Sequence, residues 1–459
     1  MVRKAAILAC LTVLALSAPA SSQETAIGTS TYALQNVRIV VSPGEVISNG
    51  TVVIQDGRIA SVGSGVRAPA GAVQLDMSGM TVYPGLIEVA SNLGLPSAGA
   101  QGFGFGGGGG PSPDGPRPEL QPMRIASEVF EGTESDMETL RKAGITTVGL
   151  AFSGGLFPGQ TAAMNTGNGD ARSQVLRQPI AMQVALNRTR GGYPSTLMGA
   201  LAYIEQSWED VRYDLRVREA FDSDPTSAPR PSFDAEHEAL VPAVTGAMPV
   251  WFAASAQRDF SRVADLAQRI GVSDYVIVGG QEGYLASGML SQLGKPMVVS
   301  LNYPNPGQVS GRAFEYHVAP ISGEDAVAAE ADSAVARDLR GNAAALVSAG
   351  VSVALSTQGG DVSEMRALVR SAIEGGLSAD DALRAVTLTP ASLLGLSGAI
   401  GSVEEGKLAN LLVTDGDLFA EGTHVLHVFV EGRKFDYPAE AATTTGRRGG
   451  RGRRGGGNR

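Results

Sequence analysis

Polar residues at the ends of predicted strands are the side chains best placed to do chemistry in this sequence. The set is rich in amides, which supply four of its nine members, so it offers many hydrogen-bond donors and acceptors. Such a set would suit a small polar ligand or a peptide. The candidate pocket residues are Glu88, Asn92, Arg188, Arg190, Gln281, Glu282, Asn302, Gln358 and Asp361.

Two of these residues, Glu88 and Glu282, could act as acid and base without a metal. A structural role is the competing interpretation for each. Glu282 stands at the start of a predicted helix, where a carboxylate interacts favourably with the helix dipole. Glu88 lies in a predicted buried strand, where an arginine would be its expected partner.

The histidines and the single cysteine do not form a metal-binding pattern. None of the four histidines has the spacing of a ligand pair, so a surface or packing role is the simpler interpretation of each. Cys10 lies in the apolar N-terminal segment, so the rest of the chain has neither a thiolate ligand nor a disulfide. The histidines are His237, His317, His424 and His427.

The elements that must position these residues alternate between strand and helix patterns. Residues 82–89 are apolar and prone to form a strand, interrupted by Pro84-Gly85. From residue 125 onward, predicted strands are followed by predicted helices, as in a parallel βα barrel. The predicted strands span 145–152, 180–186, 249–253, 275–278, 296–301 and 351–355, and the helices span 135–143, 196–214, 258–270, 282–293, 324–349 and 363–374.

Two segments before the barrel alternate apolar and polar residues in the manner of antiparallel strands. They span residues 32–41 and 50–62. Asp56-Gly57 lies inside the second segment and predicts a tight hairpin there.

Two stretches resemble the amidohydrolase superfamily, and the similarity extends over about residues 32–436. Residues 81–92 resemble its first barrel strand, in which P-G-(L/F)-I-D precedes a histidine-x-histidine pair. Residues 385–413 resemble its C-terminal signature, from T-x-N/T-P-A-x-x-L-G-L to I-G-S-x-x-x-G-K-x-A-D-L-V. The sequence looks closest to the imidazolonepropionase-like branch. The resemblance implies an α/β fold with a (β/α)8 TIM-like barrel and a small β-sandwich built from N- and C-terminal strands.

The same resemblance implies a catalytic metal, but the ligand positions are changed. Active members use histidines after the first, fifth and sixth strands, often a carboxylated lysine after the fourth, and an aspartate after the eighth. No lysine here stands where that carbamate would form, and neutral amides are poor ligands for a catalytic transition metal. We therefore predict no metal cofactor. The substituted positions are Ala90, Asn92, Ala253, Gly280 and Gln358.

Residues 1–20 predict a signal peptide, with a basic start, an apolar core and Ala18-Pro19-Ala20 as the cleavage site. A periplasmic or secreted location follows. The formal net charge is -10, although six arginines lie in the Arg/Gly-rich tail at 437–459. An acidic main body argues against nucleic-acid binding. The tail would instead contact an anionic envelope surface or the acidic body itself.

The expected domains are the signal peptide, the two parts of the sandwich at 21–80 and 391–436, the barrel at 81–390, and the tail. A Gly/Pro-rich loop at 100–122 follows the first barrel strand and is either a lid or a tolerated insertion.

Two functions remain open. The first is a metal-free pseudoenzyme that binds a small polar ligand, or that forms a homo-oligomer or a hetero-oligomer with an active paralogue. The alternative is a working amidohydrolase that acts on cyclic amides or dipeptides through a non-standard site. A divalent metal such as zinc would belong only to this alternative.

Overall fold

The structure is a computed structural model of the 459-residue chain. The expected signal peptide, the centre of the Gly/Pro-rich loop, Arg188, Arg190 and the tail lie outside the described residues. None of the helices in the described part of the chain is long and apolar enough to span a bilayer. The structure describes residues 30–96, 120–187, 194–227, 229–302 and 325–437.

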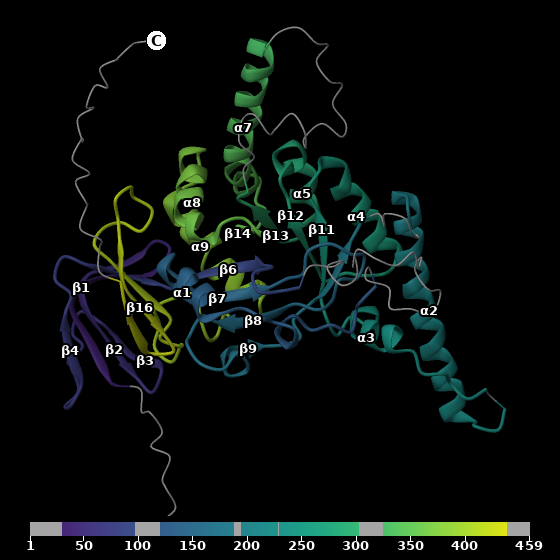
Figure 1. The fold of residues 1–459 in the computed structure, drawn as a ribbon, viewed down its shortest axis with the longest axis horizontal. Helices are drawn as coiled ribbons and strands as arrows, with labels where there is room; N and C mark the ends of the chain where they lie inside the picture. The colour runs from purple at the N-terminus through teal and green to yellow at the C-terminus, as the bar shows by residue number, and fades with distance from the viewer. Residues whose placement is uncertain (1–29, 97–119, 188–193, 228, 303–324, 438–459) are drawn as a thin grey trace, which may run out of the picture.

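The chain has a mixed α/β fold, and one sheet at one end of the molecule combines N-terminal and C-terminal strands (Figure 1). This terminal sheet has the order β17-β16-β15-β5-β1-β2-β3, with β4 beside β1. Asp56 and Gly57, both with positive φ, form the turn between β2 and β3, as the sequence predicts. The strands are β1 (Tyr32–Ser42), β2 (Glu45–Gln55), β3 (Arg58–Gly63), β4 (Val73–Asp76), β5 (Thr81–Pro84), β15 (Leu411–Thr414), β16 (Val425–Val430) and β17 (Arg433–Asp436).

Gly85 marks the point where the chain leaves the terminal sheet. β5 pairs with β1 and β15, whereas β6 (Leu86–Ser91) belongs to a second sheet. A Cβ atom at Gly85 would collide with the side chain of Thr146 on the neighbouring strand, so only glycine allows this close approach. The predicted strand at 82–89 is therefore two strands in two sheets.

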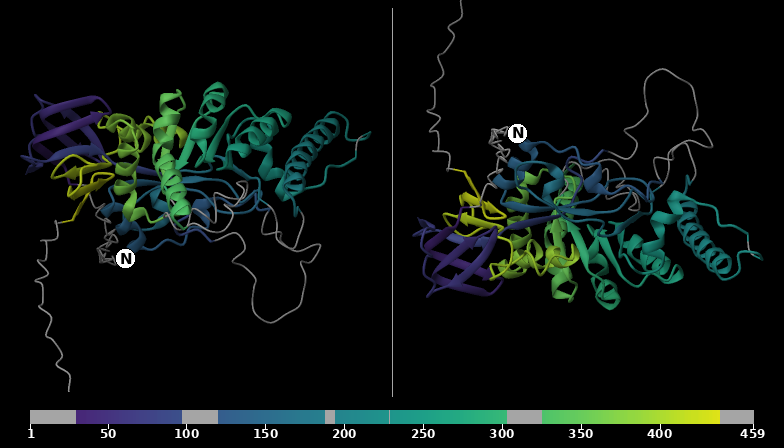
Figure 2. Two further views of the ribbon diagram at one scale, coloured as in Figure 1. Left: turned by 90° about the horizontal axis from the view of Figure 1, so that it is seen from above. Right: turned by 90° about the horizontal axis from the view of Figure 1, so that it is seen from below.

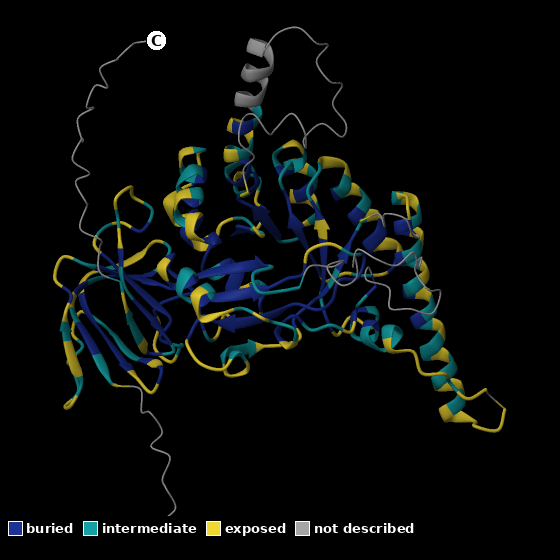
Figure 3. Cartoon of the chain, viewed as in Figure 1, coloured by how far each residue is buried: buried dark blue, intermediate teal, exposed yellow. Residues whose placement is uncertain are grey.

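The second half of the molecule contains a five-stranded parallel sheet of order β10-β11-β12-β13-β14. Its strands are nearly all buried, because helices cover one face and other strands the opposite side (Figures 1 and 3). The strands are β10 (Met182–Ala185), β11 (Val250–Ala254), β12 (Tyr275–Gly279), β13 (Met297–Ser300) and β14 (Val353–Ser356).

The third sheet, β6-β7-β8-β9, departs from the all-parallel alternation expected from the sequence. β7 (Ile145–Leu150) runs parallel to β6, but β8 (Ala162–Asn165) runs antiparallel to both β7 and β9 (Val175–Arg177). A parallel crossover needs a dozen or more residues, usually with a helix. The connection between β7 and β8 is shorter and rich in glycine, so the chain turns back instead.

Hydrogen bonds join the two inner sheets at both margins. On one side, the Thr161 N–H donates to the Ala181 carbonyl over 2.9 Å. On the other side, Glu88 of β6 accepts hydrogen bonds from Ser356 and Thr357 at the end of β14. The side chains between the sheets form one apolar cluster that includes Ile87 and Trp251.

Helices pack on the outside of the parallel sheet, and Figure 2 shows them to one side of the inner strands. The long helix α2 begins after Thr196, whose hydroxyl accepts from the Gly199 N–H, and extends beyond the predicted end at 214. The helices are α1 (Glu134–Lys142), α2 (Leu197–Ser223), α3 (Ala235–Val244), α4 (Gln257–Arg269), α5 (Ser287–Leu293), α7 (Asp325–Ser348), α8 (Met365–Glu374), α9 (Ala379–Ala385) and α10 (Leu388–Leu393).

Candidate functional site

A cavity of about 220 Å³ lies at the carboxyl ends of β6, β10, β11, β12 and β14. Parallel-sheet proteins place their binding sites at this end of the strands. Four of the five substituted metal positions line this single cavity. They are Ala90, Asn92, Ala253 and Gln358.

Gly280, the fifth position, is not among the residues that line this cavity. Its backbone has a positive φ of 54°, and a Cβ there would lie 2.7 Å from the sulfur of Met297. The residue therefore serves a tight turn after β12, and no longer side chain fits without rearrangement.

Asn92 and Gln358 are the two candidate pocket residues that the structure brings together. Gly359, the residue after Gln358, packs closely against Asn92, because a Cβ built at Gly359 would lie about 3.0 Å from the Asn92 amide oxygen. Gln358 itself has a positive φ of 44°, which is unfavourable for a residue with a side chain. Backbone strain of this kind concentrates at ligand sites, where the surroundings hold the residue in place.

Glu88 lies directly behind this cavity and is fully buried. One carboxylate oxygen accepts from the Ser356 hydroxyl and the Ala90 N–H, and the other accepts from the N–H and hydroxyl of Thr357 at 2.8 and 2.9 Å. Burial raises the pKa of Glu88, and these hydrogen bonds oppose the rise. The arginine partner expected from the sequence is absent among the described residues, and hydroxyl and backbone donors replace it.

The remaining described candidates do not line the cavity. Glu282 accepts from the Gln257 N–H at 2.9 Å, so it stabilises the start of α4 and not the helix that follows it. Asp361 accepts from the Ser363 N–H at 2.9 Å and begins a short helical turn. Gln281 donates to the Asn302 carbonyl at 3.4 Å, outside the cavity lining.

Sequence reasoning missed several lining residues. Gln183 of β10 exchanges two hydrogen bonds with the Phe152 backbone, at 2.8 and 3.1 Å, and Asn187 donates to the Gly155 carbonyl at 3.1 Å. These amides therefore fix the loop after β7. Period-two alternation along β10 and β11 was the available signal, because Gln183 and Trp251 are paired neighbours on the face that points inward.

Trp251 is the missed residue with an unsatisfied polar atom. Its side chain lines the cavity and is 1% exposed. The indole N–H has no hydrogen-bond partner within the described part of the chain. An unpaired buried donor costs about 1–3 kcal/mol.

The donors available here do not fit a divalent metal. Among the described residues that line the cavity, none carries a carboxylate, an imidazole or a thiolate. Across residues 30–96, 120–187, 194–227, 229–302 and 325–437, no group of three or more such side chains could hold a metal ion. Methyl groups, neutral amides and an indole cannot replace those ligands.

The described histidines lie elsewhere and pair with aspartates. His237 lies 2.6 Å from Asp214, and His427 lies 2.6 Å from Asp436 in the neighbouring strand. His424 is 2.9 Å from Asp415, and His317 lies outside the described residues.

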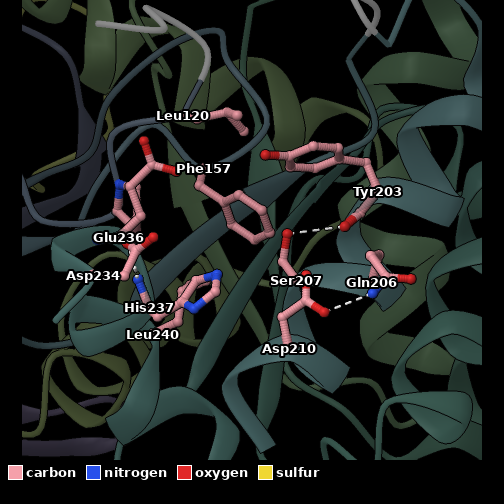
Figure 4. A pocket seen from close by; sticks show the side chains of 11 residues that line it. Leu120, Phe157, Tyr203, Gln206, Ser207, Asp210, Asp234, Glu236, His237 and Leu240 are labelled. Carbon is pink, nitrogen blue, oxygen red and sulfur yellow. Dashed lines mark hydrogen bonds between the residues drawn. The ribbon is translucent and has the colours of Figure 1, made fainter. Parts of the chain in front are cut away.

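A second cavity, of about 190 Å³, opens between α2 and α3 (Figure 4). Its polar groups mostly satisfy one another. The Gln206 amide donates to Asp210 at 2.6 Å, the Ser207 hydroxyl donates to the Tyr203 carbonyl at 2.9 Å, and Asp234 caps α3. The cavity contains none of the candidate pocket residues.

Comparison with known proteins agrees with this fold. An amidohydrolase from Thermotoga maritima MSB8 is 21% identical, with a TM-score of 0.72 over 88% of this chain and 100% of that one. A putative prolidase from Bifidobacterium longum is 18% identical, with a TM-score of 0.53 over 89% and 95%. A Xaa-Pro dipeptidase with bound methionine in the active site is 17% identical, with a TM-score of 0.51 over 89% and 100%.

At the level of sequence, none of the curated proteins matches this chain. The model of the amidohydrolase family matches residues 315–435, which include the C-terminal signature that the sequence analysis identified. With that match and the shared fold, the expected resemblance to the amidohydrolase superfamily is confirmed.

Proposed function

We propose that this protein is a metal-free member of the superfamily that binds a small polar ligand without hydrolysing it. One observation carries the proposal. Four of the five positions at which the family resemblance expects metal ligands line a single cavity, and they are Ala90, Asn92, Ala253 and Gln358. The cavity remains, while the ionisable groups that metal-assisted hydrolysis requires are replaced.

The alternative is hydrolysis of cyclic amides or dipeptides through a non-standard site. The prolidase and dipeptidase among the similar structures make dipeptides reasonable test substrates. A general base must reach the proton it removes, however, and Glu88 is the carboxylate behind the cavity. Both of its oxygens already accept two hydrogen bonds from the protein, which favours binding over catalysis.

The proposal includes a (β/α)8-type barrel and a composite sandwich. In this barrel, β8 is a strand that runs antiparallel to its neighbours. The support is that hydrogen bonds link the two inner sheets at both margins around a shared apolar cluster. In this arrangement the cavity occupies the mouth of the barrel, where barrel enzymes place their sites.

Export and partners are further parts of the proposal, and they rest on sequence alone. Residues 1–20 would direct the protein to the periplasm or outside the cell. The six arginines of the tail would give a modest, salt-sensitive attraction to an anionic envelope surface. An active paralogue would be the natural hetero-oligomeric partner.

The tail is tested by deleting residues 446–459 and measuring adsorption to anionic and neutral vesicles at low and high salt. The deletion should weaken adsorption to anionic vesicles and leave the melting temperature unchanged. Equal adsorption with and without the tail at low salt contradicts this part of the proposal.

The central test combines metal analysis, turnover and binding on the purified protein. We expect no stoichiometric zinc, iron or manganese after dialysis and no turnover of Xaa-Pro dipeptides or cyclic amides. A thermal-shift screen of small polar molecules should find a saturable ligand. Ala253→Phe, which fills the cavity, should abolish that shift, whereas Ala420→Phe at an exposed position should not. One tightly held metal per chain, or measurable turnover of these substrates, would contradict the proposal.

A further inference from the structure

A groove of about 460 Å³ lies between α4 and α5, at the amino-terminal ends of β12 and β13. It is at the opposite end of the parallel sheet from the cavity at the carboxyl ends of the strands, and the two share no lining residue. All residues that line the groove come from 261–295, a stretch that the structure describes without a gap. Its apolar walls are formed by Ala264, Ala267, Val272, Met289 and Leu293.

Tyr275 lines this groove with a hydroxyl that the protein does not use. The residue is 5% exposed, and its ring packs edge-on against Phe252 with the ring centroids 5.7 Å apart. A buried tyrosine hydroxyl usually has a hydrogen-bond partner, but this one has none among the described residues. It is not one of the unpaired polar atoms that are fully enclosed there, so it opens into the groove. Burial raises the pKa of Tyr275, which keeps the hydroxyl protonated and able to donate.

Lys295 places a positive charge beside that hydroxyl. Its ammonium lies 5.2 Å from the centroid of the Tyr275 ring and donates a hydrogen bond to the Ser273 carbonyl at 2.6 Å. These two contacts hold the ammonium in the groove and use only one of its three N–H groups. No carboxylate pairs with Lys295 in the described part of the chain. The groove therefore combines a free hydroxyl with free charged donors.

These groups define the ligand that the groove would accept. A carboxylate has two oxygens and can accept from both the hydroxyl and the ammonium, and hydrogen bonds between charged groups are the strong ones. The apolar walls require an apolar body next to that head group. Asp265 is the one carboxylate among the described residues that line the groove. It is exposed on α4 and makes no ion pair with Lys295, so water weakens its effect on a bound anion.

We infer that the groove between α4 and α5 is a second binding site, which takes a monocarboxylate with an apolar body. The carboxylate accepts hydrogen bonds from the Tyr275 hydroxyl and the Lys295 ammonium, and the body lies against the apolar walls. The volume of about 460 Å³ is within the range of about 300–1,000 Å³ that small-molecule sites span. The inference goes beyond the proposed function, because it concerns different residues at the other end of the sheet.

The test uses three probes that share one apolar chain and differ in the charge of the head group. Octanoate, octanol and octylamine are titrated into the purified full-length protein by calorimetry. We expect saturable binding of one octanoate per chain. Octanol should bind at least about tenfold more weakly, because it lacks the charge-assisted hydrogen bonds. Octylamine should also bind more weakly, because its head group has the same charge as Lys295.

Three results of these titrations would overturn the inference. Absence of octanoate binding would do so directly. Equal affinity for octanol would show that the groove recognises apolar chains alone. Tighter binding of octylamine would show that Asp265, and not Lys295, determines the preference for charge.

Two substitution pairs assign the contacts, with the melting temperature as the check on folding. Lys295→Met should weaken octanoate binding about tenfold and leave octanol binding unchanged, whereas Arg67→Met, which removes an exposed positive charge elsewhere, should change neither. Tyr275→Phe should weaken octanoate binding roughly three- to tenfold, the loss of one hydrogen bond. Tyr213→Phe is its control, because Tyr213 is 59% exposed and lies outside the groove. Unchanged affinity in both Lys295→Met and Tyr275→Phe overturns the assignment.

A last pair distinguishes this site from the cavity of the proposed function. Ala264→Trp, which fills the groove, should abolish octanoate binding, whereas Ala253→Phe, which fills the other cavity, should leave it intact. The reverse result would place octanoate in the other cavity and overturn the inference. Metal content and turnover test the proposed function and do not bear on this groove.

Discussion

Polar side chains lie at two levels in and just after strands β6 and β14, and within the described residues only the inner level is satisfied by the protein. At the inner level, Glu88 accepts four hydrogen bonds from Ser356, Thr357 and Ala90. At the outer level, a few residues farther along, the amides of Asn92 and Gln358 have no such partners in the described part of the chain. Groups that the protein satisfies hold the two sheets together. Groups that it leaves unsatisfied are available to a ligand.

The largest effect should come from breaking the inner level with Glu88→Gln. The new amide nitrogen would face N–H or hydroxyl donors, so at least one pair of hydrogen bonds is lost. A buried donor left without an acceptor costs about 1–3 kcal/mol, and we expect a loss of about 3 kcal/mol in the free energy of unfolding. Urea denaturation measures it.

Glu282→Gln is the matched control for that substitution. Glu282 makes a single hydrogen bond at the start of α4, so its loss should cost only about 0.5–1 kcal/mol. Equal costs for the two variants would show that Glu88 does not hold the sheets together.

Glu88, at the inner level, should also make the free energy of unfolding depend on pH. Burial raises the pKa of Glu88 above its ordinary value of 4.5, so the folded state keeps the proton to higher pH than the unfolded chain. The stability from this group is then fully present below pH 4.5 and is lost as the pH rises through the folded-state pKa. Urea midpoints across this range should fall more in the wild type than in Glu88→Gln. If the urea midpoints of the wild type and Glu88→Gln changed equally with pH, the raised pKa of Glu88 would be contradicted.

At the outer level, Gln358→Gly should separate stability from binding. Glycine relieves the positive φ of 44°, which costs a residue with a side chain about 1–3 kcal/mol, so the variant should gain about 1 kcal/mol. It should also lose ligand affinity, because an amide is removed from the cavity. Asp56→Gly, at a positive φ in the β2–β3 turn, is the control that leaves binding intact. A Gln358→Gly variant that binds normally would remove Gln358 from the site.

The smallest effect is expected from restoring the histidine pair. The double variant Ala90→His, Asn92→His places imidazoles in the cavity but supplies neither the remaining ligands nor a general base. Such groups act as a unit, so amidase turnover should stay at the wild-type background. Turnover above background would show that the rest of a catalytic site is intact.

The frame of this molecule was predictable because it depends on local signals. Asp56-Gly57 specified a hairpin, Pro84-Gly85 specified a break between strands, and the C-terminal signature lies within the residues that the amidohydrolase family model matches. The family pattern places the five expected metal positions at the ends of predicted strands, and their assignment as substituted ligand positions stays a prediction. Four of the five line one cavity.

The features that the sequence did not predict depend on contacts between segments that are far apart in the chain. The reversal of β8 follows from pairing with β7, and strand patterns do not encode direction. The partners of Glu88 come from residues 356–357, far away in the sequence. Trp251 looked like an ordinary strand residue, and only the structure shows that it lines the cavity and that its N–H has no acceptor among the described residues.

The composite terminal sheet has a consequence for the order of folding. β5, which ends at Pro84, is covered on one side by β15, which begins at Leu411. During synthesis, the apolar edge of β5 that pairs with β15 therefore stays without this partner until more than three hundred further residues have been made. Unpaired apolar edges invite pairing with other chains, and contacts this distant in sequence form slowly. Chaperone protection of the nascent N-terminal strands should therefore matter more for the yield of this protein than its final stability does.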